Sequence, residues 1–232
     1  MKKAHWRQWM RLFFTPICPG CQQPLNQQSL CFVCQSFLPT LSLPCPCCGE
    51  PDSNGYKCGY CLKHPARWDQ LYVPWSFEFL VRHLIIEFKY HKNFSAGFAL
   101  TEHWQQQTRP FVLPNAFIAV PMTAYKEIQR SYNQAHWIAK QFSKHHKTPI
   151  FKGLIKTVDT QPLEGLNKRQ RRRTLKGAFH LTQSPPNHVA LVDDVFTSGA
   201  TAGEIARVLK KAGVKRVDVW ALARTPFKRP SH

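Results

Sequence analysis

Residues 189–201, VALVDDVFTSGAT, combine the side chains needed to bind a sugar phosphate. The apolar run predicts a buried strand, and Asp193 and Asp194 follow it where the strand meets solvent. Carboxylates in that place can accept hydrogen bonds from sugar hydroxyls or hold the water shell of a magnesium ion. The segment after them predicts an anion-binding loop, because it offers hydroxyl donors, a glycine and the N–H groups of a following helix. The loop residues are Thr197, Ser198, Gly199, Ala200 and Thr201.

Two other interpretations of this segment exist. A Walker B strand also ends in acidic residues, but it requires a G-x-x-x-x-G-K-[ST] partner, which the sequence lacks. A purely structural strand and turn requires no partner, so this alternative stays open.

The cysteines form a second group with chemical potential. All nine lie between Cys18 and Cys61, and adding 27 to the positions of the first two Cys-x-x-Cys pairs gives the last two, so the segment is an internal duplication. Each copy offers four thiolates that can surround one zinc ion, which predicts two zinc sites. A disulfide framework is the alternative. The expected ligands are Cys18, Cys21, Cys31, Cys34, Cys45, Cys48, Cys58 and Cys61.

Cys47 is left over by this count, and the spacing leaves two questions open. Cys47 can compete with Cys48 as a ligand, and the pairs can interleave instead of pairing copy by copy. A segment this short and poor in large aliphatic residues cannot build a core alone, so metal binding would supply its folding free energy. Its expected role is structural, because four protein ligands leave no open position on either zinc ion.

The rest of the chain predicts an α/β domain that positions the first group. Apolar residues recur at helical spacing across 80–88, 135–142 and 205–212, and short apolar runs at 117–120, 189–192 and 217–222 predict strands. Gly213 is the expected stop of the last helix. Strand, loop, helix and strand make a βαβ unit, and ligands bind at the carboxyl ends of such strands. We expect a zinc-ribbon module over residues 1–66 and the α/β domain over 67–232.

Charge is the main bulk property of the chain. It carries 32 Lys and Arg against 13 Asp and Glu, a formal +19. This surplus favours a polyanionic partner, either nucleic acid, lipid or a small phosphorylated ligand, although it also serves solubility. No apolar run approaches the roughly 20 residues of a membrane span, and the basic N-terminus lacks the apolar core of a signal peptide. We therefore expect a cytoplasmic protein without a transmembrane segment, whose helix-like N-terminal stretch packs on the zinc module or lies on a membrane surface.

The order Asp-Asp, two residues, Thr-Ser-Gly-Ala-Thr resembles the phosphoribosyl pyrophosphate (PRPP) motif of type I phosphoribosyltransferases. Within them the chain most resembles the ComF family, named for competence in DNA uptake. The resemblance covers nearly the whole chain. It includes the zinc knuckles, FKYHKN at 88–93, AVPM at 119–122, RSYNQA at 130–135 and GAF at 177–179.

The resemblance implies a parallel sheet flanked by helices and a role for each matching residue. Asp193 and Asp194 would contact the ribose of PRPP, with magnesium, and the 197–201 loop would hold the 5′-phosphate. The family's R-G-F-N-Q segment reads R-S-Y-N-Q here, so Ser131 would be strained if its position needs a positive φ angle. The asparagine that the family often carries before GAF corresponds to Thr174, so its role does not transfer. The candidates for contact with pyrophosphate are Pro121, Met122, Arg130, Asn133 and Gln134.

A basic run lies between the two groups in the sequence, within residues 160–179. Related phosphoribosyltransferases close a mobile loop of this region over pyrophosphate, which is one interpretation. A grip on a nucleic-acid backbone and a solvated helix face are the other two. The run contains Lys168, Arg169, Arg171, Arg172, Arg173 and Lys176.

Two functions follow from the resemblance. The first is a PRPP-binding competence protein that handles incoming single-stranded DNA during natural transformation, alone or with a helicase or strand-loading partner. The second is a metabolic phosphoribosyltransferase that transfers ribose 5-phosphate to a small nitrogenous base. The sequence carries no base-recognition signature, so it leaves open whether the chain is an enzyme.

Overall fold

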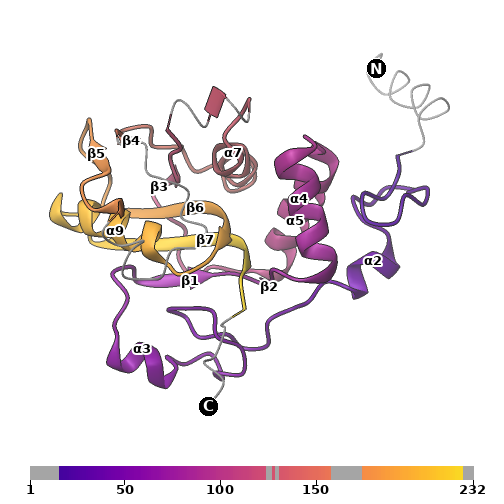
Figure 1. Cartoon of the computed structure of the whole chain (residues 1–232), viewed down its shortest axis with the longest axis horizontal. Helices are drawn as coiled ribbons and strands as arrows, with labels where there is room; N and C mark the ends of the chain where they lie inside the picture. Colours follow the sequence, from indigo (N-terminus) through magenta and orange to yellow (C-terminus); the bar gives the residue numbers. More distant parts are fainter. Residues whose placement is uncertain (1–15, 124–126, 129–130, 158–173, 227–232) are drawn as a thin grey trace.

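The computed structural model describes residues 16–123, 127–128, 131–157 and 174–226 of the 232-residue chain (Figure 1). Its centre is a five-stranded sheet in the order β1-β7-β6-β3, with β2 pairing with β7 after β1. Every pair in this sheet is parallel. The expected parallel α/β architecture is therefore confirmed. The strands are β1 Gln70–Tyr72, β2 Trp75–Ser76, β3 Ala116–Ala119, β6 His188–Phe196 and β7 Arg216–Arg224.

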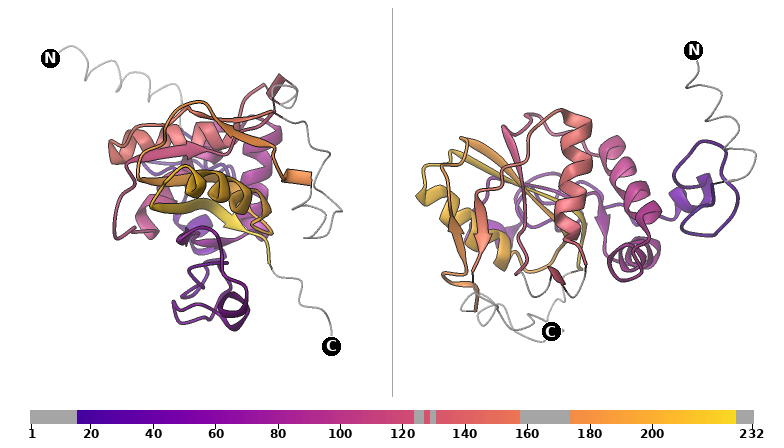
Figure 2. Two further views of the ribbon diagram at one scale, coloured as in Figure 1. Left: turned by 90° about the vertical axis from the view of Figure 1, so that its left-hand side faces the viewer. Right: turned by 90° about the horizontal axis from the view of Figure 1, so that it is seen from above.

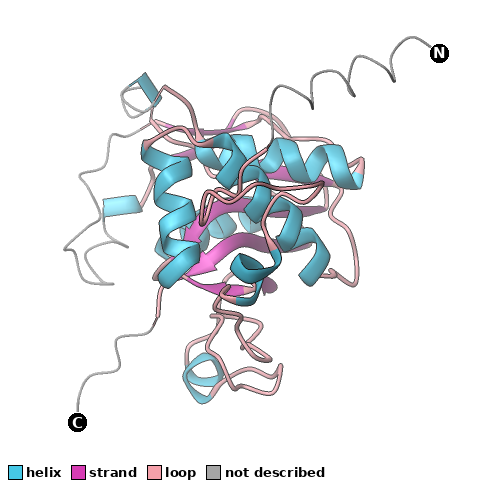
Figure 3. Ribbon diagram, turned by 90° about the vertical axis from the view of Figure 1, so that its right-hand side faces the viewer, coloured by secondary structure: helices cyan, strands magenta, loops and turns pink. Residues whose placement is uncertain are grey.

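Helices cover both faces of the sheet (Figure 3). Alternate residues of β6 and β7 face opposite sides, because side chains alternate along a strand. Val192 and Trp220 pack with one group of helices, whereas Leu191 and Val219 pack with α9 on the other face. Burial on both faces explains why these strands read as continuous apolar runs. The helices are α4 Phe79–Tyr90, α5 Phe94–Gln107, α7 Gln134–His146 and α9 Ala200–Lys211.

The helices and strands predicted between residues 80 and 222 all form, with bounds shifted by a few residues, and the helix-like N-terminal stretch lies outside the described residues. Gly213 has φ 92° and follows the end of α9, which confirms the expected stop. Sequence periodicity missed α5, whose buried face mixes Leu100 and Trp104 with small and polar residues. A Cβ on Gly97 would lie 2.6 Å from the Phe88 ring, so glycine lets α5 approach α4 closely. The antiparallel pair β4 Leu154–Lys156 and β5 Phe179–Leu181 was also missed.

The two cysteine segments pack on different parts of the α/β unit. The first, with α2 Phe32–Ser36, lies beside α4 and α5, where Leu25 and Leu30 join the core and Ser29 donates a hydrogen bond to Glu102 (Figure 1). The second, with α3 Gly59–Lys63, projects below the sheet (Figure 2, left view). The proposed domain boundary at residue 66 stays a prediction.

Arg224, the last residue of β7, forms polar contacts that join the second cysteine segment to the sheet. Its side chain is 3% exposed, its Nε donates to the Cys48 carbonyl oxygen at 2.6 Å, and its Nη2 lies 3.2 Å from Glu50 Oε2. Burial lowers the pKa of the guanidinium, and the neighbouring Glu50 carboxylate opposes that shift. Along the same edge, Leu71 N donates to Pro46 O at 2.7 Å. The segment is thus held by buried polar contacts as well as by its own cysteines.

No helix in the described part of the chain has the length and hydropathy needed to cross a membrane.

Replacing Arg224 with methionine should lower the free energy of unfolding by about 3 kcal/mol, since removing one partner of a buried ion pair leaves the other uncompensated. Denaturant unfolding in zinc-containing buffer measures the change. The double variant Arg224→Met/Glu50→Gln should recover part of the loss. A double variant no more stable than the single one would contradict the importance of this pair.

Candidate functional site

Each cysteine copy forms its own tetrad. The ligand atoms of Cys18, Cys21, Cys31 and Cys34 lie within 4.8 Å of one another, and so do those of the second copy, Cys45, Cys48, Cys58 and Cys61. The Sγ atoms of Cys21 and Cys31 are 3.6 Å apart, and those of Cys48 and Cys58 are 3.7 Å apart. A tetrahedral zinc ion with Zn–S bonds of about 2.3 Å needs sulfur atoms roughly 3.8 Å apart. Both clusters therefore fit zinc, and the ligands pair copy by copy.

Backbone N–H groups stabilise the thiolate form of the first cysteine in each cluster. Cys31 N donates to Cys18 Sγ at 3.4 Å, and in the second copy Cys58 N donates to Cys45 Sγ at 3.3 Å. Burial opposes the thiolates, but these hydrogen bonds outweigh it and lower the pKa of Cys18 to about 6 and that of Cys45 to about 7. Zinc binds the thiolate form, so one cysteine of each cluster is ready for metal, whereas burial raises the pKa of Cys34, Cys48 and Cys61.

Cys47 lies outside the second tetrad, which contains Cys48. The Cys47 side chain is buried, and burial raises the pKa of its thiol. Its carbonyl oxygen accepts a hydrogen bond from Trp68 Nε1 at 2.9 Å. Cys47 therefore lies where the second cluster contacts the α/β unit.

The two aspartates lie within β6, not beyond it, because the strand continues to Phe196. Asp194 is buried and Asp193 is partly buried. Asp193 Oδ1 accepts from Asp194 N at 2.9 Å, and Asp194 Oδ1 accepts from Val195 N at 2.7 Å. Burial raises the pKa of Asp193 to about 8, and the neighbouring Asp194 charge adds to the effect. The pair thus carries a carboxyl group that readily holds a proton at neutral pH.

Lys89, near the end of α4, is a site residue to which the sequence analysis assigned no role. Its Nζ lies 2.7 Å from Asp194 Oδ2, with both side chains largely buried. Its positive charge also opposes the upward shift of the Asp193 pKa. The only sequence signal was its place in FKYHKN, since the contact joins residues more than 100 positions apart. Lys89 adds a cation to the acidic edge of the sheet.

Only residues 197–199 of the predicted anion loop connect β6 to α9, because Ala200 and Thr201 already begin the helix. Gly199 is the N-cap of α9 and has φ 69°, a left-handed conformation that glycine adopts without strain. A Cβ there would lie 2.6 Å from Trp68 Cη2 and 2.9 Å from Phe196 Cζ, so the position also lacks room for a side chain. Thr197 is exposed and Thr201 is half-buried. No acidic side chain occupies the first turn of α9, so nothing of that kind competes with an anion at the helix N-terminus.

The segment after β3 lies next to the aspartates because β3 and β6 are parallel. Ala119 pairs with Val192, Val120 N donates to Val192 O at 2.9 Å, and Pro121 and Met122 follow, both half-buried. The structure thus brings Pro121 and Met122 to the carboxyl edge that also holds the aspartates.

Asn133 and Gln134 have hydrogen-bond partners within the protein. Asn133 caps α7, where its side-chain oxygen accepts from His136 N at 3.1 Å and its Nδ2 donates to Val120 O at 3.3 Å. Gln134 is buried and donates to Lys89 O at 3.3 Å. Ser131 has φ 64°, which is the positive angle at which a serine in place of glycine is expected to be strained. Arg130 lies outside the described residues.

Most of the basic run, including Lys168, Arg169 and Arg171–Arg173, also lies outside the described residues. Lys176 is described and exposed. It lines a cavity of about 510 Å³ between the second cysteine segment and the anion loop, together with Thr197, Ser198 and Gly199. The described part of the run therefore borders the candidate phosphate site.

Comparison with known proteins gives a consistent set of relatives. The chain is 33% identical over 228 residues to Competence protein F of Haemophilus influenzae, which covers 93% of this chain and 100% of the relative. It is 30% identical to the DNA utilization protein YhgH of Escherichia coli K12 (90% and 97% covered) and 22% identical to Competence protein ComFC of Bacillus subtilis (80% and 80%). No family model matches the chain.

A solved purine phosphoribosyltransferase from Pyrococcus horikoshii Ot3 matches with a TM-score of 0.31 and 15% identity, covering 66% of this chain and 92% of that chain.

The native chain should bind two zinc ions, and Cys31→Ser and Cys58→Ser should each bind one, because each substitution opens a different cluster. Cys47→Ser is the matched control and should keep two. Elemental analysis of protein dialysed against metal-free buffer measures the content. Loss of one zinc ion in Cys47→Ser would contradict the assignment of Cys48 as the ligand.

Asp193→Asn should stabilise the ligand-free protein in alkaline solution. The folded-state pKa of Asp193 is raised from 3.8 to about 8, so its contribution to stability is present at low pH and is lost as pH rises toward 8. The stability difference between variant and native protein should therefore shift in favour of the variant between pH 5 and about pH 9. Thermal unfolding at fixed zinc concentration tests this, and a difference independent of pH would contradict the raised pKa.

Proposed function

Because the chain belongs to the ComF family of competence proteins, we propose that it binds PRPP and handles incoming single-stranded DNA in the cytoplasm during natural transformation. The relatives named above are competence and DNA utilization proteins, and they match over nearly their whole length. A helicase or strand-loading protein is the partner that such a role calls for. The two zinc clusters serve as structural sites.

One observation carries the PRPP part of this proposal. Asp193, Asp194 and the 197–201 loop lie at the carboxyl edge of parallel strands, beside Pro121 and Met122. In open α/β sheets this edge binds ligands. The aspartates offer acceptors for ribose hydroxyls, and the loop offers hydroxyls and the N-terminus of α9 to a 5′-phosphate. Pro121 and Met122 would lie toward pyrophosphate.

The charged residues of this edge have different electrostatic roles. Magnesium, when bound with PRPP, would neutralise pyrophosphate charge and polarise the bond to the ribose. Asp194 is paired with Lys89 at 2.7 Å, whereas Asp193 has a raised pKa and would give up a proton when a cation approaches. The edge thus offers one carboxyl group paired with a lysine and one that can release a proton to a bound cation.

The DNA part of the proposal rests on charge and on the relatives. The formal charge is +19, and Lys176, the described end of the basic run, lines the cavity beside the anion loop. Lys and Arg side chains bind nucleic-acid phosphates without regard to sequence, as handling of an incoming strand requires. We place the contact with the strand on this run.

PRPP binding with magnesium, measured by calorimetry, tests the ligand site. The native protein should bind, and Asp193→Asn/Asp194→Asn should lose at least tenfold in affinity because the ribose and cation contacts go together. Asp52→Asn, an exposed carboxylate in the second cysteine segment, is the control and should bind like the native chain. All three must hold two zinc ions. Absence of PRPP binding to the native protein would contradict the proposal.

Affinity for a single-stranded oligonucleotide should fall steeply with salt. Replacing Arg171, Arg172 and Arg173 with glutamine should reduce the slope of log affinity against log salt by about 2, if each contacts one phosphate. The matched control replaces three exposed cations, Lys140, Lys144 and Lys147, with glutamine. Equal weakening in the two triple variants would show that net charge acts without a local site on the run.

A further inference from the structure

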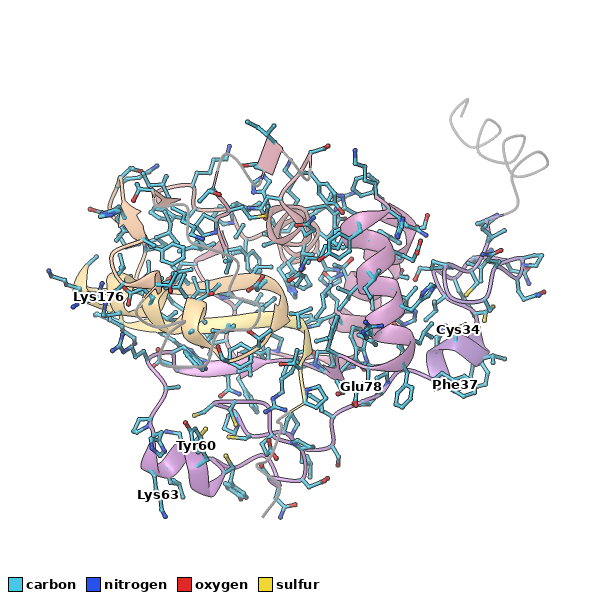
Figure 4. The ribbon with its side chains drawn as sticks, in the orientation of Figure 1. Cys34, Phe37, Tyr60, Lys63, Glu78 and Lys176 are labelled. Atoms are coloured by element: carbon cyan, nitrogen blue, oxygen red, sulfur yellow. The ribbon has the colours of Figure 1, made fainter. Side chains whose placement is uncertain are left out.

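The second cysteine segment carries a fifth cysteine that the first copy lacks. Subtracting 27 from the position of Cys47 gives Gly20, whereas the same step applied to the four ligands of the second tetrad gives four cysteines. The duplication thus supplies an internal comparison between a copy with four thiols and a copy with five. Figure 4 shows where the two copies lie, with Cys34 on α2 and Tyr60 on α3.

The backbone of the two copies is built alike around the first ligand. Gln22 N donates to Cys18 O at 2.8 Å, and in the second copy the equivalent Gly49 N donates to Cys45 O at 2.8 Å. The Cys18 and Cys45 thiolates also accept from equivalent backbone N–H groups, at 3.4 Å and 3.3 Å. The first copy therefore shows where a side chain at position 47 is directed.

That direction is toward the fourth ligand of the tetrad. A Cβ on Gly20 would lie 2.9 Å from Cys34 Sγ and 3.5 Å from Cys34 Cβ. Cys34 corresponds to Cys61 in the second copy. The side chain of Cys47 is thus a thiol placed where the duplicated backbone points at Cys61.

The contacts of the second copy agree with this comparison. Cys47 packs in one buried cluster with Cys45, Cys48 and Cys61, and it is only 3% exposed. Burial raises the pKa of the Cys47 thiol, and an interaction with the Cys61 side chain opposes that rise. Cys47 is therefore a thiol held beside a zinc ligand while lying outside the tetrad itself.

A small oxidant has a path to this pair of sulfur atoms. The cavity of about 510 Å³ is lined by Cys47, Cys48 and Cys61, next to Tyr60 and His64. A cysteine that binds zinc is in the thiolate form, which is the nucleophile toward peroxides. Redox-sensitive cysteines are commonly found beside a second thiol that completes a disulfide. The second cluster has both features at the cavity.

We propose that Cys47 and Cys61 form a disulfide when the protein meets a hydroperoxide, which removes Cys61 from the second zinc cluster. The Cys61 thiolate attacks the peroxide, the O–O bond breaks, and Cys61 becomes a sulfenic acid while the alkoxide or hydroxide takes a proton from water. The Cys47 sulfur then attacks the Cys61 sulfur, and the hydroxyl group leaves with the Cys47 proton as water. The two cysteines lose two electrons, which the peroxide gains. This inference rests on the second zinc cluster and is independent of PRPP and DNA binding.

The disulfide would weaken the second segment where it contacts the α/β unit. It leaves three cysteines in the cluster, and a segment this short depends on its metal for folding free energy. The contacts with the α/β unit start from neighbouring residues, since Cys48 O accepts from Arg224 and Cys47 O accepts from Trp68. The first segment has no fifth thiol and would keep its four ligands.

Zinc release under hydrogen peroxide, compared between the native protein and Cys47→Ser, tests the role of the fifth thiol. Both proteins must hold two zinc ions at the start. The second cluster should lose zinc roughly fivefold faster or more in the native protein, because the variant lacks the thiol that completes the disulfide. A zinc-binding dye follows the release. Alkylation of the remaining thiols and mass spectrometry follow each cluster separately, and the first cluster, which should oxidise at one rate in both proteins, is the internal control.

The disulfide itself is identified by digestion without reductant, which should give two peptides joined through Cys47 and Cys61. Dithiothreitol with added zinc should then restore two zinc ions. Equal release from the second cluster in the two proteins would show that Cys47 only fills space and would overturn the proposal. A Cys47 thiol that still alkylates after zinc has left the second cluster would also overturn it.

Trypsin cleavage after Lys57 and Lys63, both exposed in the second segment, measures the loss of its fold. Peroxide should increase this cleavage in the native protein and much less in Cys47→Ser. Cleavage after Lys92, which is exposed in the α/β unit, is the control and should not change. Unchanged cleavage after Lys57 and Lys63, once zinc has left, would overturn the weakening of the segment.

Discussion

Parallel pairing of β6 with β3 and β7 is the constraint on which the candidate site depends. Because all three strands run the same way, their carboxyl ends meet on one edge, and β6 carries both Asp193 and Asp194 there. The connection from β6 to α9 then brings the anion loop to the same edge. The register is seen in the paired residues of the three strands, with Ala119 opposite Val192 and Val192 opposite Trp220.

The cysteine clusters contribute to the domain beyond their own folding. The first shares a core with α4 and α5, and the second is tied to the sheet by Arg224 and to the loop by Trp68. Each cluster has four cysteines placed to hold a metal ion inside and contacts with the α/β unit outside. Their duplication in sequence is therefore not repeated in their surroundings, and only the second reaches the cavity.

Charge is arranged with opposite signs along the carboxyl edge. Two aspartates and Lys89 form one compact group, and Glu204 with its arginines forms another beside the anion loop. Each group mixes signs, so each limits the free-energy cost of placing charge in a poorly solvated position. This arrangement places acidic side chains at one edge of a strongly basic chain, where we propose that a sugar phosphate binds.

The sequence by itself determined the cysteine ligand groups and most of the secondary structure. Duplicated Cys-x-x-Cys spacing specified both zinc tetrads, because ligand geometry depends on local turns, and apolar periodicity located the central strands and most helices. Tertiary structure decided what those parts contact. The Lys89–Asp194 pair and the cavity between Tyr60 and the 197–201 loop both join residues distant in sequence. Such contacts depend on how layers pack, and local pattern carries no information about packing across layers.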